Sequence, residues 1–177
     1  MKYLFFSVLL FGLMSSCGSN EKPKKKSLSP HATAMSMVGD AHIHIDYSSP
    51  GVRGRTIFGD LIPYGELWRA GANNATWIES NKDLLIVGQT LPAGKYGLFV
   101  IPEKEKWILI INKNWDQHGT DDYKVEEDVL KIEVMPTELK NLQEHLEYQV
   151  VKTDEQSGII SLAWEKTKAE FPFRILQ

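Results

Sequence analysis

The sequence predicts an all-β protein, namely an antiparallel β-sandwich or flattened barrel with one or two short helical turns. First, apolar and polar residues alternate along much of the chain, as they do in strands that bury one face. Second, clusters of Gly, Pro, Asn, Asp and Ser separate these runs at short intervals. Third, helical patterns are weak and limited to residues 123–128 and 137–139. Many short strands at this spacing are typical of sandwiches and barrels.

The alternation indicates the strands, taken in chain order. Apolar residues occupy every second position from Ala41 to Tyr47, which indicates the first strand. The runs 96–101 and 107–111 are apolar on both faces, so we expect them at the centre of a sheet, joined by a hairpin loop at 102–106. Further strands are expected at residues 76–80, 84–87, 129–135, 146–152, 159–164 and 168–173, with turns at 154–158 and 165–167.

Residues 1–16 have the pattern of a bacterial lipoprotein signal peptide. Lys2 is followed by an apolar run to Met14, which is shorter than the roughly 20 apolar residues that a membrane span needs. The segment Met-Ser-Ser-Cys, residues 14–17, resembles a lipobox, in which cleavage precedes the cysteine and its sulfur receives a diacylglyceryl group. Cys17 is the single cysteine, so we expect lipidation there and no intrachain disulfide.

Residues 17–33 are expected to form the lipidated cysteine and a disordered basic tether, followed by a single β-sandwich domain at 34–177. The net charge of the chain is −3, and removing Lys2 and the four Lys and one Glu of residues 18–29 leaves −7 on the folded part. This acidic balance argues against nucleic-acid binding. Gly18 resembles the residue after the cysteine in outer-membrane lipoproteins, so we expect an anchor in the outer membrane that faces the periplasm of the bacterial cell envelope.

Four motifs occur in a fixed order within residues 40–172. They are Tyr-x-x-Pro, Gly-Arg-x-Ile-Phe-Gly, Pro-Tyr-Gly-x-x-Trp-Arg-x-Gly-Ala-Asn and Leu-x-Ala-Gly-x-Tyr-x-Leu-Phe. This set resembles the DUF2911 family, secreted and lipid-anchored proteins of unknown function found chiefly in Bacteroidota. The resemblance implies a β-sandwich and brings no agreed reaction or ligand. Ser49 stands where the resemblance leads us to expect Arg, which removes one cationic contact from that corner.

The loop PYGELWRAGANNAT, residues 63–76, is the best candidate for a binding site. Its Gly and Asn residues permit tight turns and a close approach of the backbone to a ligand. Trp68 offers an amphipathic face, and Arg69 offers a planar fork of donors for carboxylate, phosphate or sugar hydroxyls. We expect a small anionic or glycan ligand, or a partner protein, at this end of the sandwich. The expected contact residues are Arg53, Arg55, Tyr64, Trp68, Arg69 and Asn73.

A structural role is the alternative for the same loop. In that case Trp68 plugs the open end of the core, and Arg69 caps loop carbonyls or pairs with Asp60 or Glu66. A pocket lined by Trp68 beside an unpaired Arg69 guanidinium would favour binding. A buried Arg69 that is saturated by carbonyls and carboxylates would exclude it.

His42 and His44 form a second candidate site, for zinc or copper. They lie two positions apart in an expected strand, so both imidazoles project from the same face, roughly 7 Å apart at the backbone. A third ligand would come from His118, Asp46 or Glu79. The alternative is that both are ordinary histidines on a solvated face, because no His-x-x-x-His or His-Glu-x-x-His pattern is present.

A polar cluster follows the expected strand at 107–111, but no nucleophile motif accompanies it, so we expect no catalytic residues. The cluster contains Asp116, His118, Asp121 and Asp122.

The favoured hypothesis is a non-enzymatic envelope lipoprotein without a cofactor, which binds its ligand or partner at Trp68 and Arg69. The alternative is a metal-dependent periplasmic enzyme or metallochaperone that uses His42, His44 and His118. A structural envelope protein with no small ligand is a third hypothesis.

Overall fold

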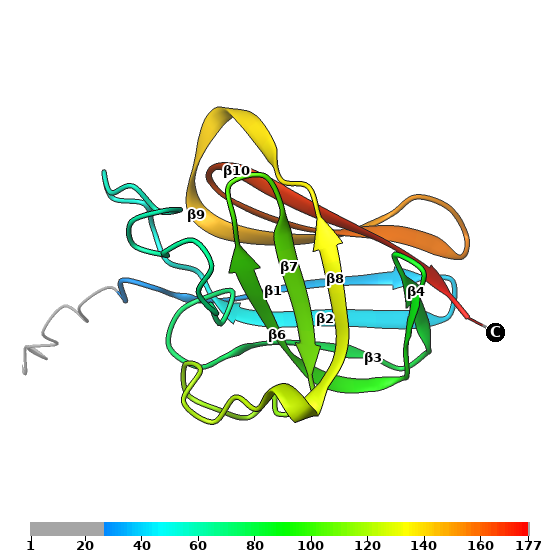
Figure 1. Ribbon diagram of the computed structural model, residues 1–177. Coiled ribbons are helices and arrows are strands. Elements are labelled where there is room, and N and C mark those ends of the chain that lie inside the picture. Colours follow the sequence, from blue (N-terminus) through cyan, green and yellow to red (C-terminus); the bar gives the residue numbers. More distant parts are fainter. Residues whose placement is uncertain (1–26, 177) are drawn as a thin grey trace, which may run out of the picture.

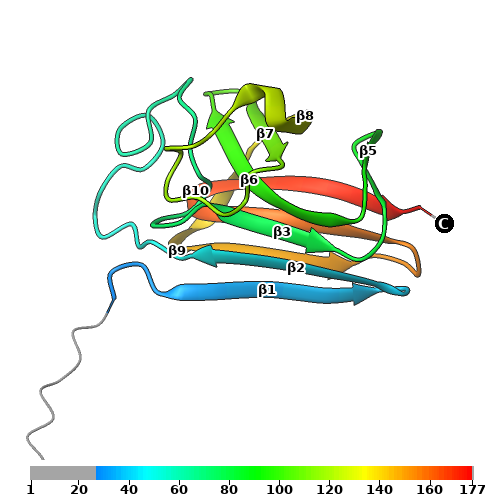
Figure 2. The same ribbon diagram turned by 90° about the horizontal axis from the view of Figure 1, so that it is seen from below.

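The chain folds into two antiparallel sheets that pack face to face. The arrangement is seen in a computed structural model that describes residues 27–176. Within these residues the larger sheet has six strands in the order β1-β2-β3-β6-β7-β8, and the smaller has four in the order β5-β4-β10-β9. Figure 1 and Figure 2 show the two layers from two directions. The sheets do not close into a barrel, so the predicted β-sandwich is confirmed.

The strands of each sheet alternate in direction, and most are short. The larger sheet contains β1 (His31–Val38), β2 (Ala41–Ser48), β3 (Thr76–Ser80), β6 (Gly94–Pro102), β7 (Trp107–Asn112) and β8 (Asp128–Val134). The smaller sheet contains β4 (Leu84–Ile86), β5 (Gln89–Leu91), β9 (Thr137–Lys152) and β10 (Ser157–Ile175). The 3₁₀ turn η1 (Val125–Glu127) lies within the expected helical turn at 123–128.

Strands β6 and β7 lie inside the larger sheet, as their apolar sequences predict. β6 pairs with β3 and β7, and β7 pairs with β6 and β8. One face of both strands contributes to the main core between the sheets. On the other face Phe99 and Ile110 form a small second core with Ala75, against which Tyr123 packs. Residues on both faces are therefore removed from water, which explains why neither strand alternates in hydropathy.

The smaller sheet corrects two predictions. Residues 137–139, expected as a helical turn, begin β9, a sheet edge whose first half is largely exposed, so its polar sequence carries no signal of period two. Residues 165–167, expected as a turn, lie inside the continuous strand β10. Glu165 has φ of +57° and the pairing with β9 shifts register beside it, so this polar run forms a bulge instead of reversing the chain.

Strand β1 begins at His31, inside the segment 17–33 that was expected to be a tether. Only Ala34 and Val38 of β1 are buried, and two small inward side chains give too little alternation for a prediction. The signal peptide at 1–16, Cys17 and the tether before residue 27 lie outside the described residues, so lipidation stays a prediction. Within residues 27–176, no helix has the length and hydropathy of a membrane span.

A long connection, residues 49–75, joins β2 to β3 at one end of the sandwich, on the left of Figure 1. The backbone of Trp68 exchanges two hydrogen bonds of 2.8 Å with Val100 on β6. The hydroxyl of Tyr148 on β9 donates a hydrogen bond of 2.8 Å to the carbonyl of Ala70. The connection is thus attached to both sheets, and it carries all six residues expected to contact a ligand.

Candidate functional site

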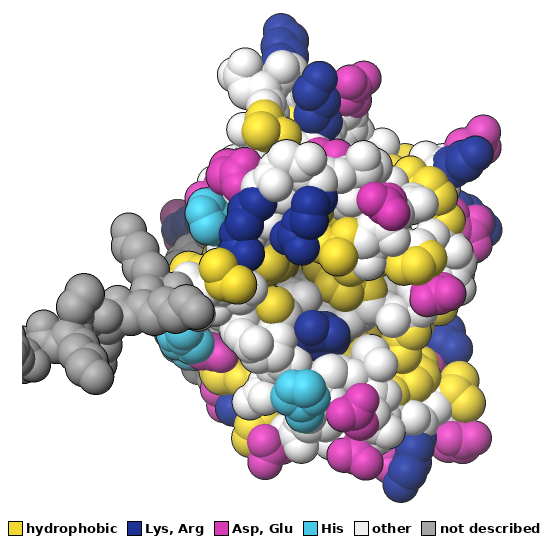
Figure 3. All heavy atoms as spheres, turned by 90° about the vertical axis from the view of Figure 1, so that its left-hand side faces the viewer, with side chains coloured by type: hydrophobic (Ala, Val, Ile, Leu, Met, Phe, Trp, Pro, Cys, Tyr) yellow, Lys and Arg dark blue, Asp and Glu magenta, His cyan; other side chains and the backbone are white. Residues whose placement is uncertain are grey.

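A pocket of about 380 Å³ opens beneath the 49–75 connection. Its walls include Arg53, Arg55, Arg69, Trp68 and Trp164, and we call it the arginine pocket. None of the described residues that line it is acidic. Figure 3 shows this end of the molecule, where basic side chains lie beside hydrophobic ones around a hollow in the surface. A concave site with apolar walls and a few polar groups is the usual form of a small-ligand site.

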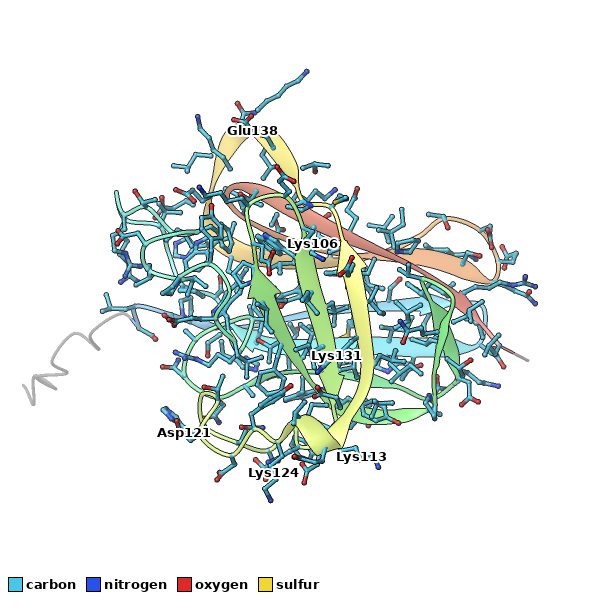
Figure 4. All side chains as sticks on the ribbon, in the orientation of Figure 1. Lys106, Lys113, Asp121, Lys124, Lys131 and Glu138 are labelled. Atoms are coloured by element: carbon cyan, nitrogen blue, oxygen red, sulfur yellow. The ribbon has the colours of Figure 1, made fainter. Side chains whose placement is uncertain are left out.

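Arg69 is the central polar group of the arginine pocket. It is half-buried, and its Nε is buried without a hydrogen-bond partner among the described residues. Burial lowers the pKa of the guanidinium, while the carboxylate of Asp121 acts in the opposite direction. Asp121 lies on the loop between β7 and η1, at the lower left of Figure 4. Since an arginine side chain stays protonated in proteins, Arg69 places a poorly solvated positive charge in the pocket wall.

Trp68, from which we expected an amphipathic face for a ligand, is a buried wall of the pocket. Its side chain is only 4% exposed, and its Nε1 donates a hydrogen bond of 3.0 Å to the carbonyl of Gly71. Its ring stacks on Trp164 with centroids 5.8 Å apart and an angle of 21° between the rings. Trp68 therefore has the buried position that the structural alternative expects, and it also lines the pocket, as the binding hypothesis expects. Arg69 forms no ion pair with Asp60 or Glu66 among the described residues, and its Nε has no hydrogen-bond partner there.

Trp164, at the centre of β10, is a pocket residue that the sequence reasoning missed. Its side chain is buried, and its Nε1 has no hydrogen-bond partner within residues 27–176. Buried Trp N–H groups usually find an acceptor, so this donor is exceptional. In the sequence Trp164 ends an apolar strand and looks like ordinary core, because only the fold places it against Trp68.

Arg55 and Arg53 complete the basic side of the pocket. Arg55 donates hydrogen bonds from Nε to Val52 O (3.1 Å) and from an Nη to Gly51 O (2.7 Å), so part of its guanidinium stabilises the loop. Arg53 has φ of +51°, and its backbone N–H donates to a carboxylate oxygen of Glu144 at 2.9 Å. The side chains of both arginines are exposed and border the same opening as Arg69.

Tyr64 and Asn73 are not brought to the arginine pocket. Asn73 donates a hydrogen bond of 3.0 Å to the hydroxyl of Ser48, and it does not line the pocket. Tyr64 packs its ring against Gly59, where a Cβ would lie 2.5 Å from a ring carbon, and it lines a different hollow. The expected set of six residues therefore divides into four that line the pocket and two that lie elsewhere.

The hollow beside Tyr64 is larger, about 600 Å³, but it is the weaker candidate. It lies beside the turn between β6 and β7, whose side chains carry both signs of charge. Lys106 in its wall already pairs with Glu133 at 2.6 Å. Among the described residues that line it, none has a buried polar atom without a partner. Nothing in this hollow requires a ligand of particular charge.

The three histidines expected to bind metal are not assembled into one site. His42 and His44 lie side by side on β2 with ring centroids 6.1 Å apart, as expected. His118 instead forms a backbone bridge with Asn74, beyond the opposite end of β3 from Glu79, the residue that faces His44. Within residues 27–176 no three His, Cys, Asp or Glu side chains are grouped to hold a metal ion.

The polar cluster after β7 is solvent-exposed. Nδ1 of His118 lies 3.4 Å from a carboxylate oxygen of Asp121, and both side chains are largely exposed. An exposed pair of this kind is screened by water and contributes little to stability. The geometry gives no reason to assign general acid or base chemistry to this loop.

Comparison with known proteins identifies the family but no relative of known role. A family model described as "Protein of unknown function (DUF2911)" matches residues 29–173, which span the sandwich from before β1 into β10 and include the whole arginine pocket except Leu28. Neither the curated proteins nor the solved structures contain a match. Because the family model covers most of the chain, this protein belongs to the DUF2911 family.

Proposed function

We propose that this protein is a lipid-anchored envelope protein that binds a small anionic ligand in the arginine pocket. One observation carries the proposal. Two buried N–H donors, Nε of Arg69 and Nε1 of Trp164, lack an acceptor in the described structure, and both residues line this one pocket. A ligand that carries acceptor oxygens would supply what both donors lack.

The energetics favour an occupied pocket. A buried donor left without a partner costs on the order of 1–3 kcal/mol of stability. Two such donors at one pocket therefore lower the stability of the protein without ligand. Acceptors with negative charge form the strongest bonds to a guanidinium, and carboxylates and phosphates match its planar fork. Burial of Arg69 strengthens this attraction, because little water competes for its charge.

The charge distribution selects an anion. The folded part of the chain is acidic overall, with about −7 on residues 30–177, yet the lining of the arginine pocket has three arginines and no described acidic residue. A local positive potential in an acidic protein attracts anions to one place and repels them elsewhere. The indole walls of Trp68 and Trp164 favour a ligand that also has an apolar or ring portion, such as an aromatic carboxylate.

The proposed anchor would hold this pocket close to the membrane. Leu28 and Ser29 line the pocket, and Cys17 precedes them by only about a dozen residues. A disordered tether of that length, the form that the sequence predicts, would have a typical end-to-end distance of roughly 20 Å. A ligand released from or presented at the periplasmic face of the outer membrane would therefore meet the pocket first.

Native mass spectrometry of the protein extracted from its own envelope tests the ligand. We expect a small acidic molecule bound to the natural protein and lost from the Arg69→Gln variant. Lys104→Gln is the matched control, because Lys104 is an exposed cation in the neighbouring hollow and should leave the adduct unchanged. Identical spectra for the natural protein and Arg69→Gln would contradict the proposal.

The anchor is tested separately by the intact mass of the membrane-extracted protein. We expect the mass of a chain that begins at Cys17 with acyl groups attached, and loss of both processing and acylation in Cys17→Ser. An unprocessed, unacylated natural chain would overturn the anchor and leave the ligand proposal to its own test.

A further inference from the structure

The outward face of the β1–β2 hairpin brings together two methionines and two histidines. In the antiparallel register Met35 lies directly opposite His44, and Met37 lies directly opposite His42. All four side chains point away from the core, and the methionines are 58% and 54% exposed. We call these residues the methionine–histidine face. Figure 2 shows β1 and β2 side by side at the edge of the larger sheet.

The turn of the hairpin fixes this register. Only Gly39 and Asp40 separate β1 from β2, and Gly39 has φ of +53°, which favours glycine. A Cβ at Gly39 would also lie 2.7 Å from the carbonyl oxygen of Glu155, so the site admits no larger residue without rearrangement. Because strand side chains alternate, a slip of one residue would turn the methionines inward, and the short turn prevents it.

The surroundings of His44 indicate a missing partner. Its Nε2 is buried and has no hydrogen-bond partner among the described residues. The edge of its ring meets Trp77 on β3, with centroids 4.9 Å apart. Glu79 is the next residue across the sheet, and Lys95 beyond it is already seated over the Trp77 ring with Nζ 3.5 Å from the centroid. Lys95 is thus held over the indole. In the tautomer that carries its proton on Nδ1, Nε2 of His44 offers a lone pair that no described group uses.

We propose that the methionine–histidine face binds one monovalent copper ion, Cu(I). Thioether sulfur is a soft ligand that selects Cu(I), and imidazole nitrogen binds copper well. Structural zinc sites use thiolate, imidazole and carboxylate ligands, whereas the four residues of the hairpin offer two neutral sulfurs and two imidazoles. Glu79 on β3 borders His44, so the preference for Cu(I) over zinc rests on the two methionines. The site differs from the expected three-histidine site in that His118 has no part in it.

The spacing of the face is compatible with one ion. Directly opposite residues in an antiparallel pair have Cβ atoms about 4.5–5.5 Å apart, which an ion bound at roughly 2.0–2.3 Å to nitrogen and sulfur can bridge. The rings of His42 and His44 are 6.1 Å apart between centroids, so the two imidazoles lie side by side on this face. An ion shared between His44 and Met35 would also give Nε2 the partner that it lacks.

Titration of the full chain in detergent with Ag(I), a redox-stable analogue of Cu(I), tests the site. A second titration uses Cu(I) itself, under anaerobic conditions and in competition with a chromogenic chelator. The Cys17→Ser background removes the single thiol as a competing ligand. We expect one saturable ion per chain, with shifts of the Met35 and Met37 methyl resonances. Met35→Leu/Met37→Leu and His42→Asn/His44→Asn should each weaken binding by at least about tenfold, since even second-shell changes cost that much in metal sites.

Matched controls separate this site from nonspecific binding. Met135→Leu removes another exposed methionine and His118→Asn another exposed histidine, and both should leave the affinity unchanged. Zn²⁺ should bind more weakly than Ag(I) and Cu(I). The proposal is overturned by the absence of saturable binding, by equal losses in the control variants, or by Zn²⁺ binding that exceeds Cu(I) binding and ignores the methionine substitutions.

Discussion

The arginine pocket and the methionine–histidine face each contain at least one buried polar atom without a hydrogen-bond partner, but the atoms are of different kinds. The pocket holds N–H donors without acceptors, on Arg69 and Trp164. The face holds an imidazole nitrogen without a partner, on His44, beside two exposed thioethers. Unused donors beside positive charge attract anions, whereas unused lone pairs of nitrogen and sulfur attract a soft cation. The same kind of observation therefore leads to ligands of opposite charge.

The two regions also differ in how they are built into the protein. The apolar walls of the pocket, Trp68 and Trp164, are part of the core between the two sheets, so the geometry of the pocket depends on the whole sandwich. The face is formed by one hairpin with a two-residue turn, and its four side chains lie outside the core. A substitution of the indoles Trp68 or Trp164 should therefore affect both folding and binding, while one on the face should affect binding alone.

The largest expected effect is on stability, from truncating the indoles of the pocket. Trp164→Ala or Trp68→Ala removes a buried aromatic ring, and such changes typically cost about 3–5 kcal/mol of the free energy of unfolding. Met35→Leu on the face should change it by less than about 0.5 kcal/mol. Urea unfolding followed by fluorescence measures both values. Similar small losses in all three variants would show that the pocket walls are not part of the core.

The next effect is an alkaline loss of stability controlled by Tyr148, which holds the Ala70 carbonyl beside Arg69. Complete burial raises the pKa of Tyr148 well above its ordinary value of 10.0. The contribution of Tyr148 to the free energy of unfolding is complete below pH 10. It falls as the pH rises further, because the phenol then loses its proton in the unfolded chain and keeps it in the folded one. The slope approaches about 1.4 kcal/mol per pH unit for one such group.

Tyr148→Phe tests this source of the alkaline effect. Between pH 8 and pH 11 the free energy of unfolding, measured in urea, should fall less steeply with pH in the variant than in the natural protein. At pH 8 the variant should lose about 1 kcal/mol, the usual value of one hydrogen bond. Parallel slopes for the two proteins would assign the alkaline loss to other tyrosines, such as Tyr47, whose pKa burial also raises.

A smaller effect of opposite sign is expected for Arg69. Without ligand its half-buried guanidinium has lost water and gained no partner, so Arg69→Met should leave stability unchanged or raise it by up to about 1 kcal/mol. Thermal unfolding of ligand-free protein measures this. A loss of more than about 1 kcal/mol would mean that Arg69 stabilises the loop by itself, as in the structural alternative.

The smallest effect separates the two regions by ionic strength. Anion binding to the partly exposed arginines should weaken several-fold between about 0.05 M and 0.5 M salt, because added ions screen the charges. Ag(I) binding to the neutral ligands of the face, measured in nitrate salts, should change by less than about twofold. Equal salt dependence at both sites would contradict the distinction between charged binding groups in the pocket and uncharged ones on the face.

The sequence predicted the strands well where successive side chains alternate between buried and exposed, or where both faces of a strand are buried. Ile43 and Ile45 on β2 and the apolar runs of β6 and β7 mark strands because one or both faces are buried. The prediction was wrong at 137–139 and 165–167, where an exposed edge and a bulge carry polar residues in extended backbone. Strand β1 was missed because its inward side chains are small and its outward ones include methionine.

The candidate site was predicted in part, and the missing parts depend on contacts between distant segments. Arg69, Arg55 and Arg53 were expected together, and they line one pocket. Trp164 could not be assigned, because 96 positions separate it from Trp68 and only packing of the two sheets brings their rings together. The pairing of methionines with histidines was likewise hidden, since it requires the register of a strand that was not expected.

The most direct test of the anion proposal observes the donors themselves. Nitrogen-15 NMR of the natural protein titrated with benzoate, and separately with inorganic phosphate, reports on Nε–H of Arg69 and the indole N–H of Trp164. We predict saturable shifts of both signals with at least one of these anions, with a smaller shift for Trp68, whose indole already donates to Gly71, and none in Arg69→Gln. Signals of Arg69 and Trp164 that stay fixed with both anions would contradict the account, and so would a Trp164 signal that moves equally in Arg69→Gln.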